Sequence, residues 1–311
     1  MAVAQALIPV FLVIALGALL KRTLLREPHV WEGLERLTFY VLFPALLVTT
    51  TATADLARVP VAGIALPLMT SILLVSAVLL IARPSLERAI ALKGPAFTSV
   101  FQGATRWNTY VALAVAGALL GADGIALASV AIVAMVPLLN VVNVLVLARY
   151  AAERAPDGRT MAVQVLRNPL IWSCVVGMTL NVSGLPLPKI AVTFGEILGR
   201  GSLAIGLLVV GAGTVLEELH KPSAPVALSG ALKLFLMPAL AIAIGYAIGL
   251  TGPALAIVAI ASSVPSAPGS YVLARQMGGD APLLAHILTV ETVAALATIP
   301  IALAGAAWLG P

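Results

Sequence analysis

The chain has 311 residues, of which 61% are hydrophobic and only 10% carry a charge. A soluble domain of this composition would expose a large apolar surface to water, so the sequence excludes a soluble protein and indicates an integral membrane protein. The net charge of +5 does not point to a nucleic-acid partner, because the basic residues flank the apolar stretches, where they orient a chain in the bilayer.

The apolar stretches have the length with which an α-helix crosses a bilayer core, roughly twenty residues. We therefore expect an all-α protein embedded in a lipid bilayer, without a soluble domain because the connections are short. In chain order, the ten predicted spans are residues 5–20, 33–54, 60–82, 95–120, 124–149, 163–183, 190–216, 223–250, 252–277 and 281–308.

Basic residues are distributed unevenly between alternate loops. One set of loops holds only Arg58 and Lys189, whereas the other set holds thirteen basic residues. Cytoplasmic loops carry the excess of Lys and Arg, so both termini are expected outside the cytoplasm and the central loop, residues 150–167, inside it. The thirteen residues are Lys21, Arg22, Arg26, Arg36, Arg83, Arg88, Lys93, Arg149, Arg154, Arg159, Arg167, Lys221 and Arg275.

The central loop divides the chain into two halves that look like copies, residues 1–155 and 156–311. Matching residues recur 160 or 161 positions apart, and an odd number of spans in each copy inverts the second copy in the membrane. The sequence thus predicts an inverted repeat of five plus five helices. The matched pairs are Pro9 with Pro169, Gly17 with Gly177, and Tyr110-Val111 with Tyr271-Val272.

The fourth and ninth spans are interrupted in their middle by residues that break a helix or hydrogen-bond in its place. Exposed backbone at bilayer depth is tolerated only where it is buried in protein or lines a cavity, so the two interruptions are predicted to form one substrate site. The candidate binding residues are Gln102, Arg106, Asn108, Thr109 and Tyr110 in the fourth span and Pro265, Pro268, Gly269, Ser270 and Tyr271 in the ninth.

Arg106 is a permanent cation near the middle of a span, where a charge costs about 3 kcal/mol on insertion scales. It needs either a buried carboxylate partner, such as Glu291, or a cavity that admits anions. An arginine whose side chain reaches the membrane interface is a further alternative. Asn108 and Thr109 are predicted to cap the half-helix that resumes at Tyr110, and the N-terminus of such a half-helix is itself an anion site.

Glu291 lies near the middle of the tenth span, where a carboxylate could carry a coupled proton or form a static pair with Arg106 or Lys233. Interhelical hydrogen bonding would explain the other polar residues of the spans equally well. The supporting candidates are Asn140, Asn143 and His286. The sequence shows no metal-binding cluster, phosphate-binding loop or nucleophile with a base, so we expect neither a cofactor nor an enzymatic activity.

Several stretches, in order along nearly the whole chain, carry a family resemblance. They are residues 39–47 (FYVLFPALL), 101–103 (FQG) with 108–110 (NTY), 167–171 (RNPLI) with 181–188 (NVSGLPLP), and 271–274 (YVLA) before 278–280 (GGD). Together they resemble the auxin efflux carrier family, which includes bacterial malonate and malate carriers and plant auxin exporters.

The resemblance implies ten helices in an inverted repeat whose broken helices four and nine cross, as in bile acid symporters and sodium/proton antiporters. It implies a scaffold of spans 1, 2, 6 and 7, through which two copies form a homodimer, and a mobile transport domain of spans 3–5 and 8–10. The plant exporters have Asn-Pro-Asn-Thr-Tyr at the fourth-span crossing, where this chain has RWNTY at residues 106–110. The proline is absent and an arginine replaces the first asparagine, a departure that argues against auxin itself as the substrate. The arginine favours a carboxylate.

The main hypothesis is a secondary transporter in the plasma (inner) membrane that moves a small organic anion by an elevator mechanism. The substrate class is a mono- or dicarboxylate such as malonate or malate, or an auxin-like anion. One alternative is a sodium-coupled symporter of the bile-acid type, although residues suited to two sodium sites are few. The other alternative is a membrane sensor that keeps the fold without transporting.

Overall fold

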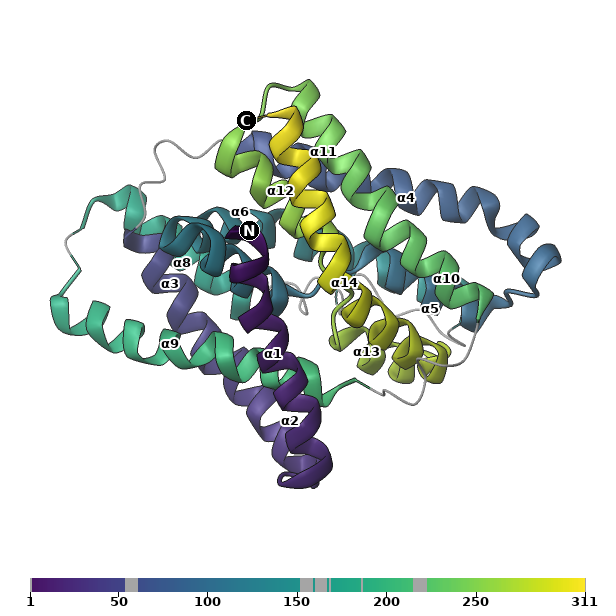
Figure 1. Ribbon diagram of the computed structural model, residues 1–311, viewed down its shortest axis with the longest axis horizontal. Helices are drawn as coiled ribbons and strands as arrows, with labels where there is room; N and C mark the ends of the chain where they lie inside the picture. The colour runs from purple at the N-terminus through teal and green to yellow at the C-terminus, as the bar shows by residue number, and fades with distance from the viewer. Residues whose placement is uncertain are drawn as a thin grey trace. The chain divides into compact units, whose positions relative to one another are not determined.

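The computed structural model describes residues 2–53, 61–151, 159, 167, 169–185, 187–214 and 223–310 (Figure 1). Its regular elements are helices, and none of the described residues lies in a β-strand. Contacts between residues divide the chain into two compact units, each assembled from three segments. Unit 1 comprises Met1–Val61, Thr109–Val133 and Gln164–Gly213, and unit 2 comprises Ala62–Asn108, Ala134–Val163 and Thr214–Pro311.

The elements of unit 1 are α1 (Ala2–Thr23), α2 (Pro28–Leu37), the π-helical turn η1 (Thr38–Leu42), α3 (Phe43–Thr53), the first part of α6 (Thr109–Tyr150), α8 (Pro169–Ser183) and α9 (Lys189–Ala212). Within this unit α9 packs against both α1 and α3, and α3 also packs against α8 (Figure 1). The helices of the two N-terminal predicted spans therefore pack against those of spans six and seven.

α1 and α9 approach each other closely because glycines lie at their contact. A Cβ atom on Gly17 would overlap the carbonyl of Leu208, and one on Gly211 would overlap the carbonyl of Ile14. Helices in a bilayer associate largely through such close packing, since lipid tails are as apolar as the side chains. The two glycines therefore set the distance between α1 and α9.

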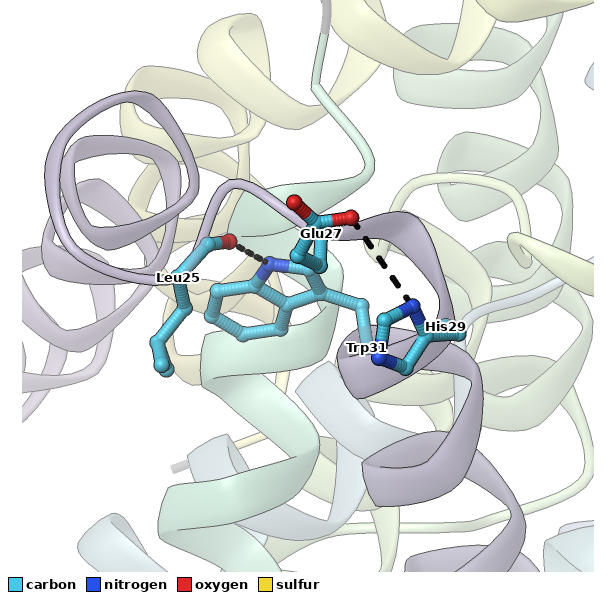
Figure 2. A network of polar contacts seen from close by, with 4 residues as sticks. All are labelled: Leu25, Glu27, His29 and Trp31. Atoms are coloured by element: carbon cyan, nitrogen blue, oxygen red, sulfur yellow. Dashed lines mark hydrogen bonds and ion pairs between the residues drawn. The ribbon is translucent and has the colours of Figure 1, made fainter.

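A tryptophan anchors the turn between α1 and α2. Trp31 is buried against Val209 and Ala212 of α9, and its indole Nε1 donates to the carbonyl of Leu25 at 2.7 Å (Figure 2). Lys21 Nζ donates to the carbonyl of Ala212 at 2.7 Å and so satisfies one of the C=O groups that the end of α9 leaves without a helical partner. The C-terminal end of α9 is thus held by both neighbouring helices.

The long helix α6 is in fact two helices joined at Gly121, whose backbone has φ 63° and ψ −146°. A Cβ atom on Gly124 would overlap the carbonyl of Ala116. Along a straight helix, residues with this spacing would lie about 12 Å apart, so the chain turns back on itself here. The turn falls where the sequence separates the fourth and fifth spans, and its positive φ favours glycine.

The elements of unit 2 are α4 (Val61–Ile90), α5 (Gly94–Thr105), the second part of α6, α10 (Ala224–Ala231), the π-helical turn η4 (Leu232–Leu236), α11 (Met237–Ala247), α12 (Gly252–Ser263), α13 (Gly269–Met277) and α14 (Ala281–Leu309). α14 packs against α5, α10, α11, α12, α13 and η4, so it lies at the centre of this unit (Figure 1).

Each π-helical turn lies just before a proline. η1 begins six residues before Pro44, and η4 begins six residues before Pro238. A proline has no N–H to donate to the carbonyl one turn earlier, and its ring clashes with that carbonyl. The wider π-helical turn relieves this clash without ending the helix. The turn in unit 2 carries Lys233, an isolated cation in an apolar helix.

Six helical segments of the described chain are long and apolar enough to cross a membrane: Pro28–Thr53, Val61–Ile90, Gly94–Tyr150, Lys189–Ala212, Ala224–Ala247 and Ala281–Leu309. The segment Gly94–Tyr150 contains the turn at Gly121 and covers two predicted spans. Shorter apolar helices, α8 and α12, lie within predicted spans six and nine. The loop at Asp55 and most of residues 150–167 lie outside the described residues. The protein is an all-helical, multi-pass membrane protein.

Candidate functional site

α5 and α12 are interrupted helices with the same construction. Each has twelve residues, begins with Gly-Pro-Ala, and ends where the next residue takes an extended backbone, Arg106 with ψ 161° and Val264 with ψ 151°. Helices resume as α6 and α13 after residues 106–108 and 264–268. We call these two short segments together the crossover.

The local sequence explains both interruptions. Pro265 disfavours a helical conformation for the residue before it, and Pro268 has no N–H to continue a helical ladder. In the other segment Asn108 directly precedes the first residue of α6, the position at which an oxygen acceptor caps a new helix. The two segments meet, because the Asn108 N–H donates to the carbonyl of Pro265 at 2.8 Å.

Ser266 connects the second segment of the crossover to the end of α5. Its Oγ lies 2.6 Å from the carbonyl oxygen of Gly103 and 3.1 Å from those of Gln102 and Arg106. A helix leaves its last C=O groups without intrahelical partners, and these groups must be satisfied when they are buried. One serine hydroxyl therefore caps α5 from the opposite segment.

Glu291 of α14 holds the same serine through its backbone. Glu291 Oε2 accepts from the Ser266 N–H at 3.0 Å, and Oε1 accepts from Ser229 Oγ of α10 at 2.8 Å. All three residues are buried. Gly103 of α5 lies so close that a Cβ atom there would overlap Ser229 Oγ and sit 3.4 Å from Glu291 Oε1. The crossover, α5, α10 and α14 therefore meet at one carboxylate.

Arg106 lies at the first interruption and is only partly held by the protein. Its Nη2 donates to Asn140 Oδ1 at 3.2 Å, whereas its Nη1 is buried without a hydrogen-bond partner in the described chain. The preceding Thr105 lies beside Asn143, with 3.2 Å between Oγ1 and Oδ1. Among the described acidic residues, none lies within ion-pair distance of Arg106. The two asparagines of α6 thus face this break, and no described carboxylate is paired with the guanidinium.

Several other buried polar groups around the crossover have no hydrogen-bond partner in the described part of the chain. They are the side-chain amide of Gln102, Ser270 Oγ and Lys233 Nζ. A buried polar group without a partner is costly, so such groups in native structures call for an explanation such as a ligand. With Arg106, these groups offer N–H and O–H donors, which suits a ligand with several acceptor oxygens.

The other predicted residues are placed less centrally. Thr109 and Tyr110 begin α6 in unit 1, where the Tyr110 ring stacks on Phe43 with 4.8 Å between ring centroids. Pro268 and Tyr271 are half-buried, Gly269 is exposed and His286 is buried in α14. Among the described residues, no group of three or more His, Cys, Asp or Glu side chains is gathered as a metal ion would require.

Sequence reasoning missed Ser229 and Ser266, and considered Lys233 only as a partner for Glu291. Small hydroxyl residues are common in membrane helices and carry no distinctive signal. Lys233 did carry a distinctive signal in the sequence, because it is an isolated charge inside an apolar stretch. Arg106 and Glu291 were identified by the same feature.

Comparison with known proteins gives two matches. Residues 2–303 match the model of a family described as "Membrane transport protein". A protein of Methanothermobacter thermautotrophicus, named "Uncharacterized transporter", is 24% identical over 147 residues. This second match covers 47% of the chain and 48% of the relative, so the chain spans about half the length of the curated relative that it matches.

Proposed function

Because the chain belongs to the membrane transport protein family, the auxin efflux carrier family that its motifs resemble, we propose that it is a secondary transporter of a small organic anion. The proposed substrate class is a mono- or dicarboxylate, such as malonate or malate, and the proposed binding site is the crossover.

Arg106 is the observation that carries this proposal. One terminal nitrogen of its guanidinium is held by Asn140, and the other is buried without a partner. A carboxylate binds a guanidinium through two parallel N–H···O bonds, and its negative charge would balance the positive charge of Arg106. The unpaired donors of Gln102 and Ser270 suit the remaining oxygens of such an anion.

We propose that transport follows an elevator mechanism, in which the helices of spans 3–5 and 8–10 carry the crossover across the membrane and those of spans 1, 2, 6 and 7 serve as the scaffold. In support, unit 2 contains both segments of the crossover together with α14, which holds them through Glu291. Unit 1 contains the helices of predicted spans 1, 2, 6 and 7, together with Thr109–Val133 from spans 4 and 5. The shared length and opening residues of α5 and α12 support the inverted repeat of ten helices on which this mechanism depends.

The proposed setting is the plasma (inner) membrane, with both termini outside the cytoplasm and two copies joined through spans 1, 2, 6 and 7. The uneven distribution of basic residues supports the orientation. Large apolar side chains exposed on α9, among them Ile190, Phe194 and Ile197, suit contact with lipid or with a second copy.

Two measurements on the purified protein test the function. A thermal-shift screen against carboxylates should find a ligand that raises the unfolding temperature, because a ligand that binds the folded state stabilises it by mass action. Counterflow of that labelled carboxylate in proteoliposomes should then show accumulation. A ligand that binds without counterflow would favour a sensor over a transporter.

Arg106→Lys keeps the charge at the crossover but loses the bidentate fork. We expect carboxylate affinity to fall by about tenfold, or about 1.4 kcal/mol, in a protein that remains folded. Arg83→Lys is the matched control, because the Arg83 guanidinium is already paired with Glu87 at 3.2 Å and lies over the Tyr150 ring. Unchanged affinity in folded Arg106→Lys would contradict the proposed site.

A further inference from the structure

Gln102 lies on the face of α5 that leads to Arg106. The Arg106 N–H donates to the Gln102 carbonyl at 2.9 Å, as in the next turn of a helix, although the backbone becomes extended after this bond. The Cβ atoms of the two residues are therefore about 5–6 Å apart on the same side of α5. The Gln102 side chain is fully buried, and it is thus a close neighbour of the guanidinium at the proposed site.

α13 runs alongside α5 in the opposite direction. Just before α13, Ser266 Oγ lies 2.6 Å from the Gly103 carbonyl near the end of α5. Just after α13, the Asp280 N–H donates to the Pro95 carbonyl at the start of α5, at 3.3 Å. Between these two points the helices pack against each other. Ser270, in the first turn of α13 and fully buried, therefore lies alongside the last two turns of α5.

The amide of Gln102 is engaged at neither of its polar atoms. Both Nε2 and Oε1 are buried without a hydrogen-bond partner among the described residues, and so is Ser270 Oγ. The conclusion does not depend on which way the amide is turned, because both atoms are free. The site thus presents an unsatisfied acceptor, Oε1, beside the donors of Arg106, Gln102 and Ser270.

A carboxylate alone does not satisfy these groups. Its oxygen atoms are acceptors, so they suit the guanidinium and Gln102 Nε2 but leave Gln102 Oε1 without a donor. A buried acceptor left in this way costs free energy. A hydroxyl on the ligand satisfies both neutral side chains, because its O–H donates to Gln102 Oε1 and its oxygen accepts from Ser270 Oγ. An ammonium would also donate, but it would bring a second positive charge next to Arg106.

We propose that the substrate is a hydroxycarboxylate, whose carboxylate binds Arg106 and whose hydroxyl binds between Gln102 and Ser270. The inference rests on the proposed function and narrows it, because a carboxylate without a hydroxyl, such as malonate, is then a poor substrate. Gln102 becomes the residue that determines this specificity.

The first test compares carboxylates that differ in one hydroxyl: malate with succinate, lactate with propionate, and tartronate with malonate. Their affinities for the purified protein are measured from the rise of the unfolding midpoint with ligand concentration. We expect the hydroxylated member of each pair to bind at least about tenfold more tightly, because the other member leaves Gln102 Oε1 unsatisfied. Alanine, which has an ammonium in place of the hydroxyl of lactate, should bind more weakly than lactate.

The second test changes the protein. Gln102→Met keeps a side chain of similar length but removes both amide atoms. We expect the preference for the hydroxylated ligand to fall below about threefold, while the unfolding midpoint without ligand is not lowered, because two unpaired polar atoms are lost. Thr298→Val is the matched control. Thr298 Oγ1 is also buried without a partner in the described chain, but the residue lies about 10 Å past Glu291 along α14, away from the start of α5. This variant should keep the full preference.

Three results would overturn the inference: equal affinity for the two members of every pair, a preference that persists in folded Gln102→Met, or tighter binding of alanine than of lactate. If Gln102→Met does not fold, the ligand pairs still decide on the parent protein. Binding and counterflow of carboxylates irrespective of a hydroxyl would reject this inference alone. A protein that binds none of these carboxylates and shows no counterflow would reject the proposed function as well.

Discussion

Ser266 shows how much of the candidate site depends on one small side chain. Its N–H donates to Glu291, and its Oγ lies within hydrogen-bond distance of three carbonyls at the end of α5. Ser266→Ala keeps the first bond and leaves the carbonyl of Gly103 without its hydroxyl donor, which costs about 1–3 kcal/mol for a buried group. We expect a lower unfolding midpoint and weaker carboxylate binding in the thermal-shift assay.

Ser262 provides the matched control for this prediction. It is as buried as Ser266, but its Oγ donates to the carbonyl of Val258 at 2.7 Å within its own helix, where that carbonyl already has a backbone partner. Ser262→Ala should therefore change stability by no more than about 0.5 kcal/mol. Equal losses in the two variants would show that Ser266 does not cap α5.

At the scale of the helices, the sequence predicts an interruption where prolines remove backbone hydrogen-bond donors. Pro265 and Pro268 mark the ninth span, and the structure has no helix at residues 264–268. The polar run of the fourth span contains no proline, and there the helix continues to Thr105, because Ser266 of another segment caps its end. Such a partner depends on tertiary packing and leaves no local signal. The π-helical turns likewise leave no local signal in the sequence, because a proline by itself predicts only a kink.

The interruption of the ninth span can be removed by restoring the missing backbone donors. Pro265→Ala with Pro268→Ala allows a helix to run from α12 into α13, which would withdraw the Pro265 carbonyl from its bond to the Asn108 N–H. We expect carboxylate binding and counterflow to be lost in a protein that remains helical by circular dichroism. Pro253→Ala is the control, since Pro253 lies in the first turn of α12, where the missing N–H is harmless.

A double variant that binds and transports normally would show that the ninth interruption is a kink without a role in the site. The substrate contacts would then have to be sought at the first segment alone, around Arg106 and Asn140.

For the whole molecule, the distribution of basic residues predicts which loops face the cytoplasm. Single cysteines at Asp55 and Asp157, in a Cys174→Ser background, test the orientation in intact cells with a maleimide that cannot cross the membrane. We expect labelling at position 55 and none at position 157. Cys174 is buried and unpaired, so its replacement removes the background thiol. The reverse pattern of labelling would invert the topology.

The charge of Arg106 also has an electrical consequence. No described carboxylate lies within ion-pair distance of Arg106, so the empty crossover carries the positive charge of this arginine, and a bound monovalent carboxylate would neutralise it. Moving one elementary charge through 100 mV changes its free energy by about 2.3 kcal/mol, so the return of the empty carrier should depend on membrane potential while the loaded passage should not. The rate at which labelled substrate exchanges for unlabelled substrate should therefore not depend on an imposed membrane potential. The rate of net efflux should depend on it, because net efflux requires the return of the empty carrier.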